Sequence, residues 1–195
     1  MRVKDEHKEA IIREKALIML VEEGFDGFSM QKLAKASNVS PATIYLYFKN
    51  KEDLLNKLFN EVEQTFFKCS MVDFDPEKSF EECLWQQWKN RFIYNLQYPN
   101  HFRFMDQFRT SPLINHKDVK ETNFKEAMKK AVQNAIERKE LIELPMEMYW
   151  AIAYGPLYAL IRFHLGTKNM MGGKFEFDEP KMRQAFNVVV RALKP

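Results

Sequence analysis

Flexible and cross-linking residues are scarce in this chain of 195 residues, which has six glycines, eight prolines and two cysteines. No Ser-rich or single-residue tract occurs, so neither a flexible linker nor a disordered tail has compositional support, and a folded protein is expected. Cys69 and Cys83 have no paired spacing with each other or with the histidines that would suggest a metal site. Both thiols are therefore expected to be reduced and structural.

Long hydrophobic runs are also lacking. The longest apolar stretch, residues 148–161, is too short to span a bilayer and contains Gly155 and Pro156. This stretch lies in a helix that is apolar nearly all round, so we expect the helix to be buried on every side. Residues 1–10 are charged where a secretion signal would be apolar. We therefore expect a cytoplasmic protein with no membrane partner.

Catalytic signatures are missing as well. The sequence offers no nucleophile with a base, no paired carboxylates at a defined spacing, no glycine-rich phosphate loop and no metal cluster. We expect no enzyme activity and no cofactor. The formal net charge is only +3, and residues 1–55 carry nine basic and nine acidic side chains, so net charge alone does not indicate a nucleic-acid partner.

The sequence does contain a run of closely spaced helix signals near its N-terminus. Apolar residues at helical spacing predict a helix over residues 8–23, ended by Gly24, which can adopt the left-handed conformation that closes a helix. Ser29 is a good N-cap for a short helix over residues 30–36. Asn38, one of the few residues besides glycine that tolerate positive φ, then predicts a tight turn.

A third helix is predicted over residues 41–48, because Ser40 and Pro41 together form a strong start signal. Its inner face carries Ile44 and Phe48, and a fourth helix follows Asn50 and continues to about residue 69. Two short helices joined by a tight turn, with a long helix before and another after, are typical of a helix-turn-helix. In that arrangement the second short helix enters the major groove of DNA.

Residues 8–56 also resemble the DNA-binding segment of TetR/AcrR-type transcription regulators. The resemblance rests on Gly24-Phe25, Ser29-Met30, Leu33-Ala34, Asn38-Val39-Ser40, Thr43-Ile44-Tyr45, Tyr47-Phe48 and Lys51-Glu52-Asp53-Leu54. Asn38 and Ala42 stand where this family commonly has glycine. The turn should accept Asn38, because asparagine visits the same backbone region, but the base preference near Ala42 does not follow from the family.

Contacts with DNA are expected from the outer face of the third helix and from its surroundings. Thr43, together with Ala42 and Leu46, is a candidate for contact with base edges, since these residues lie opposite the inner face. The resemblance implies that Tyr45 and Tyr47 contact phosphates through their hydroxyls. The full candidate set is Ser29, Lys32, Ser40, Pro41, Ala42, Thr43, Tyr45, Leu46, Tyr47 and Lys51.

Charge supports this placement. Lys51 lies at the start of the fourth helix, where an ammonium and a helix N-terminus together attract phosphate. Residues 29–60 carry five lysines against Glu52 and Asp53, a local charge of +3. Each tyrosine could instead pack on a neighbouring helix, and each lysine could be an ordinary solvated residue.

The rest of the chain predicts further helices, over residues 76–98, 101–110, 117–139, 146–165 and 180–193. The expected fold is all-α with about nine helices. A three-helix helix-turn-helix domain, residues 1–55, would precede a larger helical ligand-binding and dimerisation domain, residues 56–195. The last two helices have wide apolar faces, and pairing with a second copy would bury them in a four-helix bundle. The alternative is that they complete a monomeric core.

Aromatic residues gather in this larger region, and the resemblance implies that they line a small-molecule cavity. Arg91, Asn95, His101 and Gln107 lie nearby as candidate polar anchors. The candidate ligand-binding residues are Trp85, Trp88, Phe92, Phe104, Met105, Phe108, Phe124, Tyr154 and Tyr158. Ordinary helical cores are built from the same residues, so a packing role is the alternative for each of them.

Taken together, the sequence predicts a dimeric TetR-type transcription regulator. It would act as a repressor that binds a palindromic DNA operator and is released by a small hydrophobic or aromatic ligand. The alternative is a helical protein-interaction module in which the DNA-binding motif is a relic. Salt-dependent binding of non-specific duplex DNA distinguishes the two, because a relic would show none.

Overall fold

The computed structural model describes residues 6–114, 123–166 and 172–195, and these residues form nine α-helices and no strand. The predicted all-α fold is thereby confirmed. The chain divides into two compact units, the first within residues 1–65 and 98–120 and the second within residues 66–97 and 121–195. α4 (Lys51–Ser70) begins in the first unit and ends in the second.

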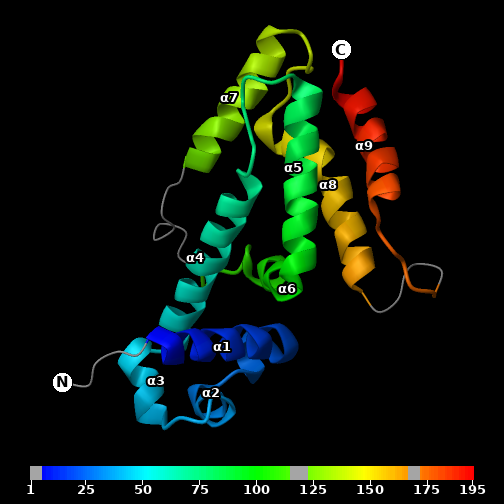
Figure 1. Ribbon diagram of the computed structural model, residues 1–195. Coiled ribbons are helices and arrows are strands. Elements are labelled where there is room, and N and C mark those ends of the chain that lie inside the picture. Colours follow the sequence, from blue (N-terminus) through cyan, green and yellow to red (C-terminus); the bar gives the residue numbers. More distant parts are fainter. Residues whose placement is uncertain (1–5, 115–122, 167–171) are drawn as a thin grey trace. The chain divides into compact units, whose positions relative to one another are not determined.

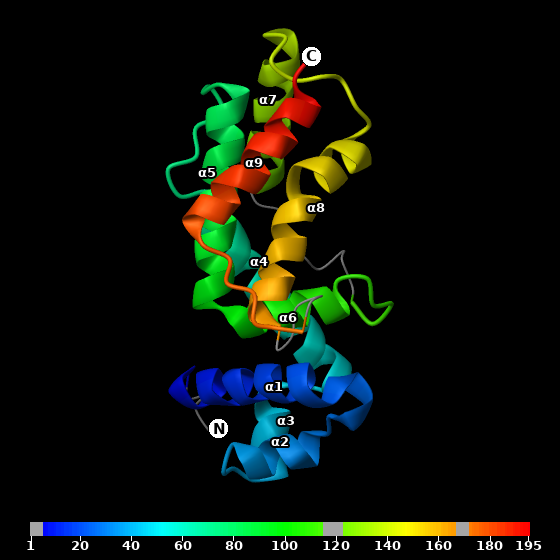
Figure 2. The ribbon, with the colours of Figure 1, turned by 90° about the vertical axis from the view of Figure 1, so that its right-hand side faces the viewer.

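The first unit contains α1 (Glu6–Gly27), α2 (Met30–Ala36), α3 (Pro41–Tyr47), most of α4, and α6 (Pro99–Phe108). Figures 1 and 2 show α2 and α3 on one side of α1 and α6 on the other. The apolar faces of these helices meet in one core, to which α6 contributes Phe104 and Phe108. α6 is therefore part of the unit that holds the helix-turn-helix, although it lies far from it in the sequence.

Two positive-φ residues shape the N-terminal helices. Gly24 has a φ of 70° and kinks α1, which continues to Gly27, so the predicted helix end at Gly24 is a kink followed by one further turn. Asn38 has a φ of 53° and turns the chain between α2 and α3, as predicted. The Val39 N–H donates a hydrogen bond to the carbonyl oxygen of Ala34 (3.0 Å), which closes this turn.

The second unit contains the end of α4 together with α5 (Phe80–Gln97), α7 (Asn123–Glu137), α8 (Met146–Leu165) and α9 (Glu179–Leu193). α5 packs against α7 and α8, and α9 packs against α8. Trp88 of α5 joins three of these helices. Its indole Nε1–H donates to the carbonyl oxygen of Ala153 in α8 (2.8 Å), and its ring meets Phe186 of α9 edge-on. The predicted helix over residues 117–139 starts at positions that lie outside the described residues.

α8 is not buried on every side, contrary to the expectation from its apolar sequence. Within one chain it buries a face that includes Tyr149, Ala153 and Leu157. Met148 is 50% exposed, and Gly155 is exposed as well. The sequence pattern specified an apolar surface, but a single chain covers only part of it. No helix in the described ranges is long and apolar enough to cross a membrane.

Candidate DNA-binding surface

Two serines fix the start of the two short helices. The Ser29 Oγ accepts a hydrogen bond from the backbone N–H of Lys32 (3.2 Å), and the Ser40 Oγ accepts one from that of Thr43 (3.2 Å). Each serine thereby satisfies a backbone donor that a helix leaves without an internal partner. Pro41, at the first position of α3, lacks the N–H that would also be unpaired there. α2 and α3 thus begin at residues fixed by local chemistry.

α3 divides cleanly into a buried and an exposed face. Ile44 and Phe48 are wholly buried in the core, as predicted. On the other face, Tyr45 is 54% exposed and Leu46 is 47% exposed. Pro41 and Ala42 are exposed as well. This face of α3 is therefore open to solvent, and its side chains are accessible to a partner.

The two tyrosines of α3 have different environments. Tyr47 is only 6% exposed and packs into the core, and its carbonyl oxygen accepts a hydrogen bond from the Lys57 Nζ (2.9 Å). Tyr45 is therefore the tyrosine that α3 leaves open to a partner. Thr43 is half-buried, and its Oγ1 lies 2.9 Å from the Ser40 Oγ, so a polar group stands at the exposed start of the helix.

The N-terminus of α4 is held by a reciprocal pair of side chains. The Asn50 Oδ1 accepts a hydrogen bond from the backbone N–H of Asp53 (2.8 Å), and the Asp53 Oδ2 accepts one from that of Lys49 (2.9 Å). Partial burial raises the pKa of the Asp53 carboxyl, but the bonds from the Lys49 N–H and the Lys57 ammonium outweigh it and hold the pKa below its usual value. Asp53 is therefore charged at neutral pH.

The lysines predicted to lie near DNA are not equivalent. The Lys32 Nζ already binds the Glu23 carboxylate (2.6 Å) and the carbonyl oxygen of Gly27 (2.9 Å), so it ties α2 to the end of α1. The Lys51 Nζ lies 3.9 Å from the centre of the Phe25 ring, and among the described residues it has no carboxylate partner. The ring holds the Lys51 ammonium without neutralising it.

Sequence reasoning missed how closely α6 is bound to this unit. The Gln107 Nε2 of α6 donates to the carbonyl oxygen of Val21 in α1 (3.1 Å), beyond the shared apolar core. The Asn56 Nδ2 of α4 donates to the carbonyl oxygen of Leu113 (2.9 Å), just after α6. The only signal in the sequence was the amphipathic pattern of α6, which predicts a helix but not its partner.

The predicted ligand-binding residues fall into both units. Phe104, Met105 and Phe108 belong to the first unit, where Phe104 and Phe108 are core residues. The remaining six residues belong to the second unit: Trp85, Trp88, Phe92, Phe124, Tyr154 and Tyr158. The aromatic residues therefore serve two separate cores.

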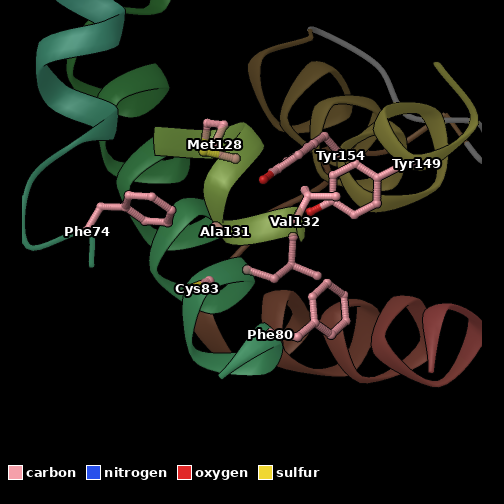
Figure 3. A pocket seen from close by; sticks show the side chains of 9 residues that line it. Phe74, Phe80, Cys83, Met128, Ala131, Val132, Tyr149 and Tyr154 are labelled. Carbon is pink, nitrogen blue, oxygen red and sulfur yellow. The ribbon is translucent and has the colours of Figure 1, made fainter. Parts of the chain in front are cut away.

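A small hollow lies in the second unit, with a volume of about 10 Å³, which is room for about one water molecule. Of the predicted ligand-binding residues, Tyr154 lines it (Figure 3). Its other walls are Phe74, Phe80, Cys83, Leu84, Met128, Ala131, Val132 and Tyr149. Burial raises the pKa of the Cys83 thiol to about 11, so this wall of the hollow is uncharged at neutral pH.

α3 is a capped short helix that follows a tight turn, and it has one face in the core of the first unit and the other in solvent. This arrangement defines a helix-turn-helix DNA-binding domain. Residues 12–58 match the family model described as bacterial regulatory proteins, tetR family. The chain is 39% identical over 101 residues to an uncharacterized HTH-type transcriptional regulator of Haemophilus influenzae, an alignment that spans 52% of this chain and 53% of that protein. It is 38% identical over 69 residues to the fatty acid metabolism regulator protein of Bacillus subtilis, spanning 35% of this chain and 36% of that protein.

Likeness of fold extends over nearly the whole chain. A crystal structure of a TetR-family transcriptional regulator from Haemophilus influenzae superimposes with a TM-score of 0.77 and 26% identity, over 97% of this chain and 98% of that one. The curated relatives are matched over about a third to a half of their length, whereas the solved structure is matched almost completely. The chain belongs to the TetR family of helix-turn-helix transcription regulators, a family of DNA-binding proteins and not of enzymes.

Proposed function

We propose that the chain is a dimeric repressor that reads a palindromic operator with α3 of each copy and leaves the DNA when a small apolar ligand binds. The observation that carries the proposal is the contrast along α3, where Ile44 is wholly buried and its neighbours Tyr45 and Leu46 are about half exposed. These exposed residues offer a hydroxyl and methyl groups, which suit a phosphate and the thymine methyl in a major groove.

Lys51 and the start of α4 support the phosphate part of this surface. A helix N-terminus carries a partial positive charge, and the Lys51 ammonium lacks a carboxylate partner among the described residues. Lys51 therefore adds a full charge where α4 begins. The ten residues of the candidate set then divide into two groups. Five of them mainly build the domain: Ser29, Lys32, Ser40, Pro41 and Tyr47. The other five face the DNA: Ala42, Thr43, Tyr45, Leu46 and Lys51.

Dimerisation is supported by the apolar surface that one chain leaves uncovered. Met148 of α8 and Val188 of α9 are 50% and 57% exposed, and α8 and α9 pack against each other. A second copy that lays its own α8 and α9 over this surface would bury both helices in a four-helix bundle. A two-fold dimer presents two copies of α3, which matches an operator with two symmetric half-sites.

Ligand sensing is proposed for the second unit, whose core is rich in aromatic rings. α4 runs from the first unit into the second, so a change in the packing around its C-terminal end can reach the helix that carries Lys51. A ligand that acts in this way must bind the form released from DNA more tightly than the DNA-bound form.

Reciprocity of binding tests the proposal. An operator is first selected from random duplexes, and compounds that raise the melting temperature of the protein are then titrated with and without that operator. The proposal requires operator DNA to weaken the binding of the compound by the same factor by which the compound weakens operator binding. A stabilising compound that binds equally well in both titrations would refute the sensing mechanism and leave DNA binding intact.

A further inference from the structure

Arg91 is a fully buried cation in the second unit. It lies on α5 and is 1% exposed. Its Nε and Nη2 donate to the Gln87 Oε1 (3.3 and 3.1 Å), and its Nη1 donates to the Tyr158 hydroxyl (2.5 Å). Within the described part of the chain no carboxylate pairs with it. A guanidinium has five N–H donors and stays charged, so two donors and one full positive charge are left over.

Aromatic rings form the walls around this charge. The guanidinium carbon lies 4.2 Å from the ring centre of Tyr154, 5.0 Å from that of Phe66 and 5.0 Å from that of Trp150. The rings of Phe124 and Tyr158 also lie within 6 Å. The faces of these rings attract a cation but do not neutralise it. Burying a charge without a counter-ion lowers the stability of a fold. A protein that keeps such a charge is therefore expected to use it in its function.

A second polar group with an unused proton lies on a ring that packs against the guanidinium. The hydroxyl of Tyr154 is buried and interacts with the hydroxyl of Tyr149 as the acceptor, while its own proton has no acceptor among the described residues. Tyr154 reaches the hollow from α8 together with Tyr149, opposite Met128 of α7 (Figure 3). Burial raises the pKa of Tyr154 to about 12, so the hydroxyl keeps its proton at neutral pH and can donate it in a hydrogen bond.

Gln87, one helical turn before Arg91 on α5, is itself held in place by a hydrogen bond. The Gln87 Nε2 donates to the carbonyl oxygen of Ser70 (2.8 Å), which fixes the orientation of the amide that accepts from Arg91. The Ser70 Oγ is also buried without a partner in the described residues. Arg91 is thus positioned by a hydrogen-bonded neighbour, while donors beside it remain available.

We propose that the second unit binds an organic anion with an apolar body and one carboxylate, which pairs with Arg91 and accepts a hydrogen bond from Tyr154. This inference rests on the proposed function, because it names the class of ligand that the sensor takes. One carboxylate neutralises one guanidinium, whereas a doubly charged phosphate would leave a negative charge in an aromatic enclosure. The apolar body extends into the hollow between α5, α7 and α8.

The hollow is too small for such a ligand, so binding must displace side chains. Met128 and Leu84 line it, and methionine adapts readily to a new shape because its side chain is unbranched and flexible. A ligand that pushes α7 away from α5 changes the packing of the second unit. The anion site therefore also supplies a route from ligand binding to a change in helix packing.

The test compares ligands that differ only in the head group. Straight-chain carboxylates from hexanoate to hexadecanoate, and phenylbutyrate, are each titrated into the full-length protein beside the matching alcohol and the matching amine. Calorimetry gives the affinities. At least one carboxylate should bind about 10-fold or more tightly than its alcohol and its amine, because a hydrogen-bonded charge pair adds to the same apolar contact.

Three variants locate the head group. Tyr154→Phe keeps the ring over Arg91 and removes the hydroxyl, so it should weaken the carboxylate about 10-fold and leave the alcohol unchanged, with no loss of melting temperature. Arg91→Gln should abolish the preference for carboxylate over alcohol. Arg183→Gln is the control, since the Arg183 guanidinium lies 3.3 Å from the ring centre of Trp85 but is exposed, and it should change nothing.

The proposal is overturned if no carboxylate of the series binds, if alcohol or amine binds as tightly, or if Tyr154→Phe leaves carboxylate affinity intact. The measurement on Tyr154→Phe tests the proposal even if the Arg91→Gln variant fails to fold. Operator affinity is measured in the same samples to separate this proposal from the sensor function. If an alcohol releases the operator as well as its carboxylate does, the anion site is refuted and the sensing function stands. If a carboxylate binds but does not release the operator, the anion site stands and the sensing function is refuted.

Discussion

Asn38 turns the chain between α2 and α3 with a φ of 53°, a conformation that costs most residues energy. Asn38→Val should lower the free energy of unfolding by about 1–2 kcal/mol, because a β-branched side chain is strained there. Asn38→Gly should change it by less than about 1 kcal/mol, since glycine adopts positive φ freely. Urea titration measures both. A Val variant as stable as the Gly variant would show that the turn does not constrain this residue.

Asp53 closes the N-terminus of α4, and its contribution should depend on pH. Its pKa in the folded protein lies below the ordinary value of 3.8, so the charged form stabilises the fold above that pH and the contribution is lost as the pH falls below it. Asp53→Asn should lower the free energy of unfolding by about 1 kcal/mol at pH 7. The difference from the native protein should shrink towards pH 3. Glu52→Gln is the matched control, because Glu52 is exposed one residue earlier.

At the scale of the elements, α3 and α4 should divide the recognition of DNA between them. Lys51→Ala should weaken binding to all duplexes by similar factors and reduce the slope of log K against log salt by about one, because phosphate contacts do not read sequence. Fluorescence anisotropy at several salt concentrations measures this slope. Lys129→Ala, an exposed lysine of α7, is the control and should leave the slope unchanged. Equal effects of both variants would mean that only net charge matters.

Thr43 at the start of α3 is expected to read a base. Thr43→Ala should alter the preference at one position of each half-site, at a cost of roughly 1–3 kcal/mol for the preferred base. Sequencing of selected duplexes measures the preference. An unchanged motif would remove Thr43 from the reading surface and confine its role to the hydrogen-bonded pair with Ser40.

Local signals in the sequence predicted the elements well, because caps, turns and breakers act over a few residues. Ser40, Pro41 and Asn38 predicted α3 and its turn. Pro99 was expected only to end the preceding helix, whereas it is the first residue of α6, two residues before the predicted start. The helices that α6 packs against could not be predicted from the sequence. Phe104 and Phe108 would show the same apolar spacing in either of the two units. The pairing of Lys32 with Glu23 is likewise set by the three-dimensional packing of α1 against α2. The sequence identified Arg91 as a candidate polar anchor, but its burial without a carboxylate partner among the described residues required the structure.

At the scale of the whole molecule, two neighbouring residues of α9 test the proposed dimer. Val188 is 57% exposed and Val189 is 4% exposed in one chain. Val188→Glu should give a folded monomer, because its carboxylate would be buried without a partner only in the dimer. Val189→Glu should instead lower the melting temperature, because it charges the core of the chain itself. Light scattering gives the molar mass, and a Val188→Glu variant that remains dimeric would place the interface elsewhere.

Selection of duplexes from a random library by the full-length protein, followed by measurement of affinity against salt, tests the central claim most directly. The exposed face of α3, presented twice by a dimer, predicts enrichment of an inverted repeat whose half-sites lie about one helical turn apart. Affinity for the repeat should fall steeply with salt and exceed that for random duplex by at least about 10³-fold. No enriched sequence, together with affinity that does not depend on salt, would contradict the account and favour an interaction module that has lost DNA binding.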